Sequence, residues 1–254
     1  MSRALNISIR DLLMLKSPEI PSFTIDPILL LHNTPVSEYR KIADLGSGTG
    51  ILPFLIWSLN PHLQTRNSIV GFEREKLFLD HSMNSLALNP QISGISFLEQ
   101  DIRFSPPSEF IGSFDLVLSN PPFIKMGHGK LSPNPAKNAI NFETDTKLID
   151  FFSFASKILR PDGILGIFMK ADRMEETFRI ANETGYTPLV LRIVHSTISS
   201  PGRAFLLYLR RGGKSTLKIL PPLVVHGKDG THSDEVENYF ASINSSGCFT
   251  EKRS

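Results

Sequence analysis

The chain has 254 residues, of which 41% are hydrophobic and 20% charged, and its formal net charge is +2. This composition suits one α/β domain with a sizeable core and permits a nucleic-acid partner without requiring one. The one cysteine, Cys248, lies in a polar tail, which excludes a disulfide framework and a cysteine metal site. Arg10 and Asp11 interrupt the apolar residues near the N-terminus, so we expect neither signal peptide nor membrane span, and a cytoplasmic location.

Short apolar runs bounded by turn residues alternate with helical patterns along most of the chain. The apolar runs predict strands at 41–45, 68–72, 94–98, 114–118, 164–169, 189–194 and 204–209. The helical patterns predict helices at 51–57, 75–88, 144–159 and 172–184, with a long polar loop over 123–142. The connection between the last two strands is too short for a helical crossover, so these strands should be antiparallel.

This order of elements predicts a Rossmann-like, doubly wound α/β fold. Its sheet should be mostly parallel and seven-stranded, with one antiparallel strand, and ligands should collect at the carboxyl ends of the strands. We expect an N-terminal extension over 1–22, a catalytic domain over 23–226, and a C-terminal helix and tail over 227–254.

A glycine-rich turn follows the first strand of this predicted sheet. It reads Asp44-Leu45-Gly46-Ser47-Gly48-Thr49-Gly50. Glycine permits positive φ and removes Cβ atoms that would hold a ligand away from the backbone. A dinucleotide site favours G-x-G-x-x-G, whereas the spacing here is G-x-G-x-G. The turn therefore favours a small cofactor other than NAD, and a turn without any ligand is the alternative.

Three acidic residues lie at the ends of the first three strands. Glu73 follows the second strand, where a carboxylate can accept hydrogen bonds from ribose hydroxyls. Asp101 is placed to accept from an adenine amino group with Ile102 against the ring, and Asp44 would face a cationic amino group. Acids after strands are also common as helix caps and solvated turn residues, which is the alternative interpretation.

The tetrapeptide Asn120-Pro121-Pro122-Phe123 follows the fourth strand. The Asn120 side-chain oxygen and the Pro121 carbonyl can accept the two hydrogens of an amino or carboxamide nitrogen and so position it for attack. Pro122 fixes the turn, and Phe123 offers a flat face for a flipped-out base. With the glycine turn, this motif predicts an S-adenosylmethionine-dependent N-methyltransferase. A Pro-Pro turn without catalytic role is the alternative.

The order of motifs resembles the bacterial N6-adenine methyltransferases that modify an adenine beside the anticodon of a valine tRNA, within the class I methyltransferase superfamily. Four stretches carry the resemblance: 24–30, 44–50, 120–133, and 203–207 leading to 221–226. It implies the class I methyltransferase fold, S-adenosyl-L-methionine as cofactor and an RNA substrate, with tRNA expected. Two departures are Phe123 where the family usually has Tyr, and Ile140-Asn141-Phe142-Glu143 where it tends to have Ala-Arg-His-Glu.

These departures leave the acceptor open. Asn-Pro-Pro-Phe also occurs in guanine-N2 methyltransferases of ribosomal RNA, and protein glutamine-N5 methyltransferases grip a carboxamide by the same geometry. A cofactor-binding module without catalysis is a further alternative, disfavoured because Asn120, Pro121 and the three motif glycines are all present.

Two stretches without acids carry basic residues. The first contains Lys125, His128, Lys130 and Lys137, and the second contains Arg203, Arg210, Arg211, Lys214 and Lys218. Loops of this kind beside an active site can follow RNA phosphates, and we expect RNA contacts from Lys125, His128, Lys130 and Arg203. Solvated faces without a partner are the alternative. The histidines show no metal-ligand spacing, so no metal is expected, and we expect a monomer or weak homodimer.

Overall fold

The computed structural model describes residues 5–9, 12–21, 24–64, 68–121, 124–125, 142–143 and 145–243. Its seven longer sheet strands are β3 (Ile42–Leu45), β4 (Ile69–Glu73), β5 (Ile95–Glu99), β6 (Phe114–Ser119), β9 (Leu159–Lys170), β10 (Tyr186–His195) and β11 (Gly202–Arg211). Two-residue strands are β12 (Lys218–Ile219) and β13 (Leu223–Val224) in the same sheet, and β7 (Ile124–Lys125) and β8 (Phe142–Glu143), which pair with each other.

The central sheet confirms the predicted fold class. Its strand order is β12-β10-β11-β9-β6-β3-β4-β5, with β13 also paired to β10, and β11 runs antiparallel to both of its long neighbours. The strands β9, β6, β3, β4 and β5 are mutually parallel. The two short strands β12 and β13 widen the predicted seven-stranded sheet to nine strands.

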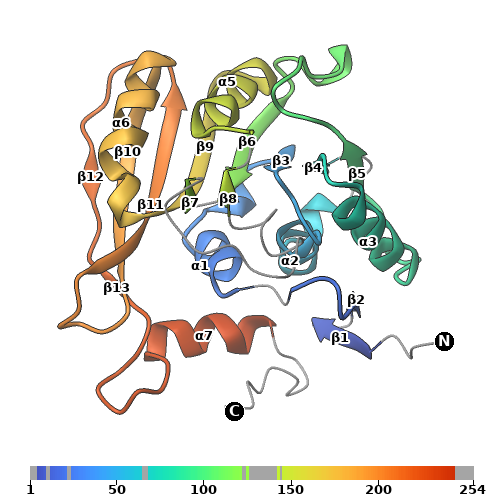
Figure 1. The fold of residues 1–254 in the computed structure, drawn as a ribbon, viewed down its shortest axis with the longest axis horizontal. Helices are drawn as coiled ribbons and strands as arrows, with labels where there is room; N and C mark the ends of the chain where they lie inside the picture. The colour runs from blue at the N-terminus through green and yellow to red at the C-terminus, as the bar shows by residue number, and fades with distance from the viewer. Residues whose placement is uncertain are drawn as a thin grey trace.

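Helices cover both faces of the sheet (Figure 1). They are α1 (Asp26–His32), α2 (Ile51–Leu59), α3 (Lys76–Ala87), α5 (Leu148–Ile158), α6 (Met174–Glu183) and α7 (Asp234–Ile243). One core cluster joins α1, α2, α3 and α7 to one face, and a second joins α5 and α6 to the other. Adjacent residues of β3 divide between them, since Ile42 belongs to the first cluster and Ala43 to the second. These strands are buried on both faces and are therefore almost continuously apolar. This pattern made it possible to predict them from the sequence.

Among the helices and the longer strands of the central sheet, three segments differ most from the sequence prediction. Helix α5 begins at Leu148 instead of 144, where the Lys147 N–H donates to the Asp150 side chain at 2.7 Å. Strand β9 begins directly at Leu159 and includes the turn-like residues 160–163, with Asp162 at a φ of 62°. Helix α1 was not predicted: it has seven residues and nearly all are buried, so it has no amphipathic period to detect.

The chain segments before and after the sheet both pack against the helices that cover one of its faces. The hairpin of β1 (Leu5–Ile9) and β2 (Leu12–Lys16) is held by Asn89, whose side chain accepts from the Leu13 N–H at 2.9 Å and donates to the Leu13 carbonyl at 2.7 Å. Helix α7 crosses below α1 and α2 in Figure 1, where the Tyr239 ring stacks on His32 at 4.5 Å. The domain boundaries expected after residues 22 and 226 stay predictions.

Candidate active site

The sheet order reverses between β3 and β6, and both predicted motifs leave the sheet at this point. Leu45 at the end of β3 pairs with Ser119 at the end of β6, so the glycine turn and Asn120 begin side by side. The Ser119 hydroxyl donates to the Leu45 carbonyl at 2.8 Å, which ties the two strand ends together. Leu45 also pairs with Phe72, which places Glu73 next to the turn. A topological switch point is where open α/β sheets bind ligands.

The glycine turn has the backbone conformation that its glycines permit. Gly46, Gly48 and Gly50 have φ values of 72°, 54° and 80°, in the left-handed region that side chains rarely adopt. A Cβ on Gly48 would meet no atom within 4 Å, so its backbone borders open space. A Cβ on Gly50 would lie 2.6 Å from the Phe97 ring, so the structure gives Gly50 a packing role, and its contact with a cofactor stays a prediction.

Asp44 lies in β3 beneath this turn and is 3% exposed. Burial, and secondarily the negative charge of Glu73, raises the pKa of Asp44 to about 8. A buried carboxyl with a raised pKa gains strongly from a nearby cation, because the cation favours its ionised form. The surroundings of Asp44 therefore fit the predicted role of facing a cationic amino group.

Glu73 holds the glycine turn from the neighbouring strand. Its Oε2 accepts from the Gly48 N–H at 2.8 Å, and its Oε1 accepts from the N–H groups of Arg74 and Glu75 at 2.9 Å. Burial raises the pKa of Glu73, and these backbone hydrogen bonds oppose the rise. Each carboxylate oxygen can accept about two hydrogen bonds, so Oε2 keeps room for one ribose hydroxyl instead of the two expected from the sequence.

Asp101 follows β5 and is engaged by an arginine that sequence reasoning missed. The Arg103 side chain donates to both Asp101 oxygens at 2.5–3.0 Å and to Asp145 at 2.6 Å. These hydrogen bonds are the main cause that lowers the pKa of Asp101. Asp145 also pairs with Arg74 at 2.8 Å, so one ionic network spans the ends of β4 and β5. Ile102 beside it is buried, and the predicted adenine contacts of both residues stay predictions.

Two buried polar atoms in the site have no hydrogen-bond partner among the described residues. They are the side-chain oxygens of Asn120 (Oδ1) and Ser47 (Oγ). A buried oxygen without a partner is costly, so such atoms indicate groups that complete their hydrogen bonds with a ligand. Pro121 is buried beside Asn120, while Pro122 and Phe123 lie outside the described residues.

The residues expected to contact RNA divide between described and undescribed parts of the chain. Lys125 lies in β7, of which only the backbone is described, and His128 and Lys130 lie outside the described residues. Arg203, the second residue of β11, lies at the same end of the sheet as Asn120. Arg210 and Arg211 are the last residues of β11 and lie at the opposite end. The second basic stretch is therefore two separate surfaces, because strand β11 carries its ends roughly 25 Å apart at about 3.3 Å per residue.

Sequence reasoning also missed residues that shape the site through packing. Gly71 lies mid-strand in β4, and a Cβ there would be 2.6 Å from the Phe97 ring and 2.8 Å from the Ser47 Oγ. An isolated glycine inside a strand pattern is a signal of such close approach. Asp26 lies in the stretch 24–30 that carries the resemblance, but neither it nor Lys170 was predicted as a site residue, because their proximity depends on which elements become neighbours.

The fold, the glycine turn at the switch point and the Asn-Pro turn beside it define a class I S-adenosylmethionine-dependent methyltransferase. The methyltransferase small domain family model matches residues 25–185, and the chain belongs to this family. Its cofactor is S-adenosyl-L-methionine, and the partnerless Ser47 hydroxyl, the buried Asp44 carboxyl and the open space at Gly48 fit this cationic molecule.

Curated relatives agree with this membership, and a solved structure shares the fold. The chain is 26% identical over 188 residues to a tRNA1(Val) (adenine(37)-N6)-methyltransferase from Tolumonas auensis, covering 73% of this chain and 75% of the relative. It is 24% identical over 216 residues to the protein of the same name from Dickeya chrysanthemi, covering 84% and 83%. A predicted O-methyltransferase from Agrobacterium tumefaciens shares the fold with a TM-score of 0.68 at 18% identity, covering 87% of this chain and 98% of that one.

Two further observations concern other kinds of site. Within the described part of the chain, no group of three or more His, Cys, Asp or Glu side chains is placed to hold a metal ion. None of the helices in that part combines the length and apolarity needed to cross a membrane.

Proposed function

We propose that this enzyme methylates the exocyclic N6 of an adenine in RNA, with a tRNA as its substrate. The observation that carries the proposal is the Asn120 Oδ1 atom, which is buried next to the glycine turn and has no hydrogen-bond partner among the described residues. This oxygen lacks a hydrogen-bond donor, which an N–H group of the molecule to be methylated would supply. The names of the curated relatives, which modify adenine 37 of a valine tRNA, support RNA adenine as that acceptor.

An adenine N6 is a poor nucleophile because its lone pair is delocalised into the ring. In this proposal Asn120 accepts one N6 hydrogen through Oδ1 and the Pro121 carbonyl accepts the other, which directs the nitrogen lone pair away from the ring plane. The cofactor supplies an electrophilic methyl group on a sulfonium. On transfer, the new bond from N6 to the methyl carbon would replace the sulfur–carbon bond, whose electron pair would stay on sulfur, and the N6 proton would pass to water. A neutral Asn is a feeble base, so its contribution is positioning and electrostatics.

Glu73 and Asp44 act on the cofactor side. Glu73 fixes the Gly48 N–H and so the shape of the turn, and it keeps an acceptor site on Oε2 for a ribose hydroxyl. Asp44 supplies a buried carboxyl with a raised pKa, which the cationic end of the cofactor would favour in its ionised form. These roles orient the cofactor and leave the acceptor chemistry to the Asn-Pro turn.

The test is an incubation with methyl-labelled cofactor and separate tRNA, ribosomal RNA and protein fractions. The labelled fraction is then digested to nucleosides or amino acids. We expect label in tRNA as N6-methyladenosine. Label as N2-methylguanosine in ribosomal RNA, or as N5-methylglutamine in protein, would replace the proposed acceptor.

A further inference from the structure

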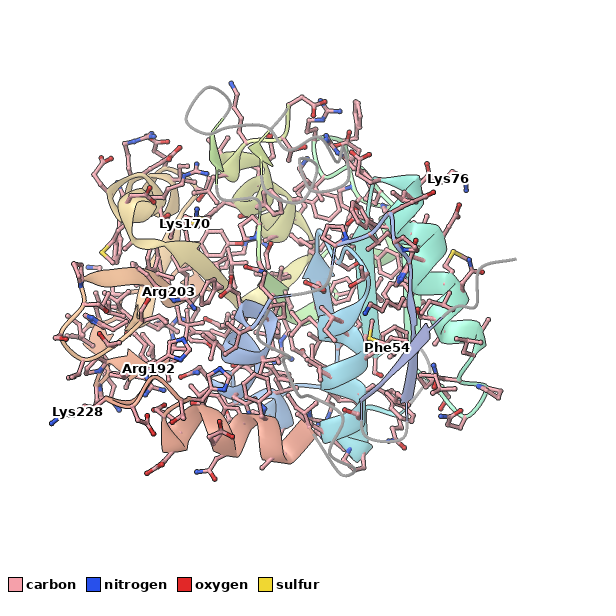
Figure 2. All side chains as sticks on the ribbon, turned by 60° about the horizontal axis from the view of Figure 1, so that its bottom comes forward. Phe54, Lys76, Lys170, Arg192, Arg203 and Lys228 are labelled. Carbon is pink, nitrogen blue, oxygen red and sulfur yellow. The ribbon has the colours of Figure 1, made fainter. Side chains whose placement is uncertain are left out.

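Two cations meet at the same edge of the sheet as the Asn-Pro turn. Strand β9 ends at Lys170, and β11, running the other way, begins with Gly202 and Arg203, so that Lys170 pairs with Ala204. Strand β9 is also the neighbour of β6, with Ile167 opposite Ser119. Lys170 and Arg203 therefore lie on the side of Asn120 away from the glycine turn. Figure 2 labels both on the β9–β11 side of the molecule, opposite Lys76 at the start of α3.

A buried acid holds the second of these cations. Asp26, the first residue of α1, accepts from the Arg203 Nη2 at 3.3 Å, and the side chains are 11% and 35% exposed. Burial raises the pKa of Asp26, and the charges of Arg203 and Lys170 oppose the rise. The bond to Asp26 is the single hydrogen bond that the Arg203 guanidinium donates among the described residues, although a guanidinium has five N–H donors. Arg203 is thus held at one nitrogen, and its other N–H groups donate to none of the described residues.

We propose that Lys170 and Arg203 bind a backbone phosphate of the acceptor RNA, beside the nucleotide whose base enters next to Asn120. This inference rests on the proposed function. A base that leaves its stack for an active site turns inward, while its phosphates stay at the surface of the enzyme. An arginine fork matches phosphate oxygens and a lysine adds a point charge, so two cations from adjacent strands suit one phosphate.

The competing explanation is that Arg203 serves only to neutralise Asp26. A double substitution separates the two. If Arg203 only neutralises Asp26, the damage from Arg203→Met comes from an unpaired buried charge, and adding Asp26→Asn should restore RNA affinity. If Arg203 binds phosphate, the lost affinity should persist in the double variant. Thermal unfolding of the same proteins reports the structural cost separately.

The experiment measures affinity for an unmodified valine tRNA transcript over a series of salt concentrations. Lys170→Ala and Arg203→Met should each weaken binding by about tenfold or more, the usual size for a charge-assisted hydrogen bond. Loss of both cations should reduce the slope of log affinity against log salt by about 0.7–0.9, the value for one phosphate, and each single substitution should give part of this change. The KM for RNA should rise while cofactor affinity and the rate at saturating RNA change little.

The matched control is Lys157→Ala, an exposed lysine at the end of α5, which leads into the start of β9 and so lies at the opposite edge of the sheet. Wild-type-like RNA binding by both site variants, or full rescue of Arg203→Met by Asp26→Asn, would overturn the phosphate assignment while RNA methylation by the wild type still stands. If the wild type neither binds nor methylates RNA, the proposed function fails and this inference fails with it.

Discussion

Asn120 lies at the end of the sheet where the parallel strands terminate. The side chains on either side of it at this end carry opposite charges, and we call the two sides the acidic half and the basic half. The half formed by β3, β4 and β5 presents Asp44, Glu73 and Asp101, whereas the half formed by β9 and β11 presents Lys170 and Arg203. Two arginines also lie on the acidic half, Arg74 and Arg103, and both are ion-paired with acids, as Arg203 is with Asp26 on the basic half. The acidic half suits a cationic cofactor, and the basic half suits a polyanion.

Burial separates the halves as clearly as charge. Asp44 and Glu73 are buried and Glu73 is fixed by three backbone N–H groups, so the cofactor half is organised before any ligand binds. Lys170 and Arg203 are only half-buried. Salt screens exposed charges far more than buried ones. Cofactor binding should therefore depend on pH more than on salt, and acceptor binding on salt more than on pH.

The largest expected effect comes from the residue between the halves. Asn120→Ala should lower the single-turnover rate by a hundred- to a thousandfold, since one positioned contact in the transition state is worth about 3–4 kcal/mol. Cofactor affinity should stay close to wild type, because Asn120 acts on the acceptor nitrogen. A variant with wild-type single-turnover rates would show that the Asn-Pro turn does not position the acceptor.

A smaller effect is expected within the acidic half. Glu73→Ala should weaken cofactor binding by roughly 1.5–3 kcal/mol, or about ten- to a hundredfold, the size of hydrogen bonds to a charged group. Because Glu73 also holds the Gly48 N–H, thermal unfolding must be measured alongside calorimetry. Unchanged affinity in the folded variant would remove Glu73 from the cofactor site, and NAD should not compete in either protein.

Phe123 tests whether the acceptor is a base. Stacking of a base on an aromatic side chain contributes about 1–3 kcal/mol. Phe123→Ala should therefore reduce RNA methylation by the factor that corresponds to this free energy, and Phe123→Tyr should keep most of the wild-type activity. Lys125→Ala with Lys130→Ala should instead weaken RNA binding and flatten its salt dependence. If Phe123→Ala methylates RNA as well as wild type, the nucleobase acceptor is wrong.

The sequence could predict the parts of this molecule that depend on local patterns. The doubly wound sheet followed from apolar runs, and the conformation of the turn at Gly46 and Gly48 followed from glycine spacing. The pairing of Arg103 with Asp145 and the contact of Asp26 with Arg203 join residues that are far apart in the sequence, so local patterns could not reveal them. The second basic stretch divides into two surfaces for a similar reason. The direction of β11, and not the number of charges, decides at which end of the sheet each arginine lies.

The last prediction concerns the proton on Asp44. Its pKa is raised to about 8 in the folded protein, above the ordinary value of 3.8, so this carboxyl favours the folded state at low pH. That contribution is fully present below about pH 4 and is lost as the pH rises to about 8, by at most about 1.4 kcal/mol per pH unit. The cofactor-free protein should therefore lose stability across this window, and Asp44→Asn should remove the loss.

Cofactor binding should show the opposite trend, because the cationic cofactor favours ionised Asp44. Affinity should rise with pH below about 8 by up to tenfold per unit, with a proton released on binding. Calorimetry at pH 7 in two buffers of different ionisation enthalpy measures that proton directly. Asp44→Asn should bind the cofactor more weakly and without proton release. If the variant kept the same release and pH slope, the titrating group would lie elsewhere, and the acidic half would owe its pH dependence to Glu73, whose pKa burial also raises.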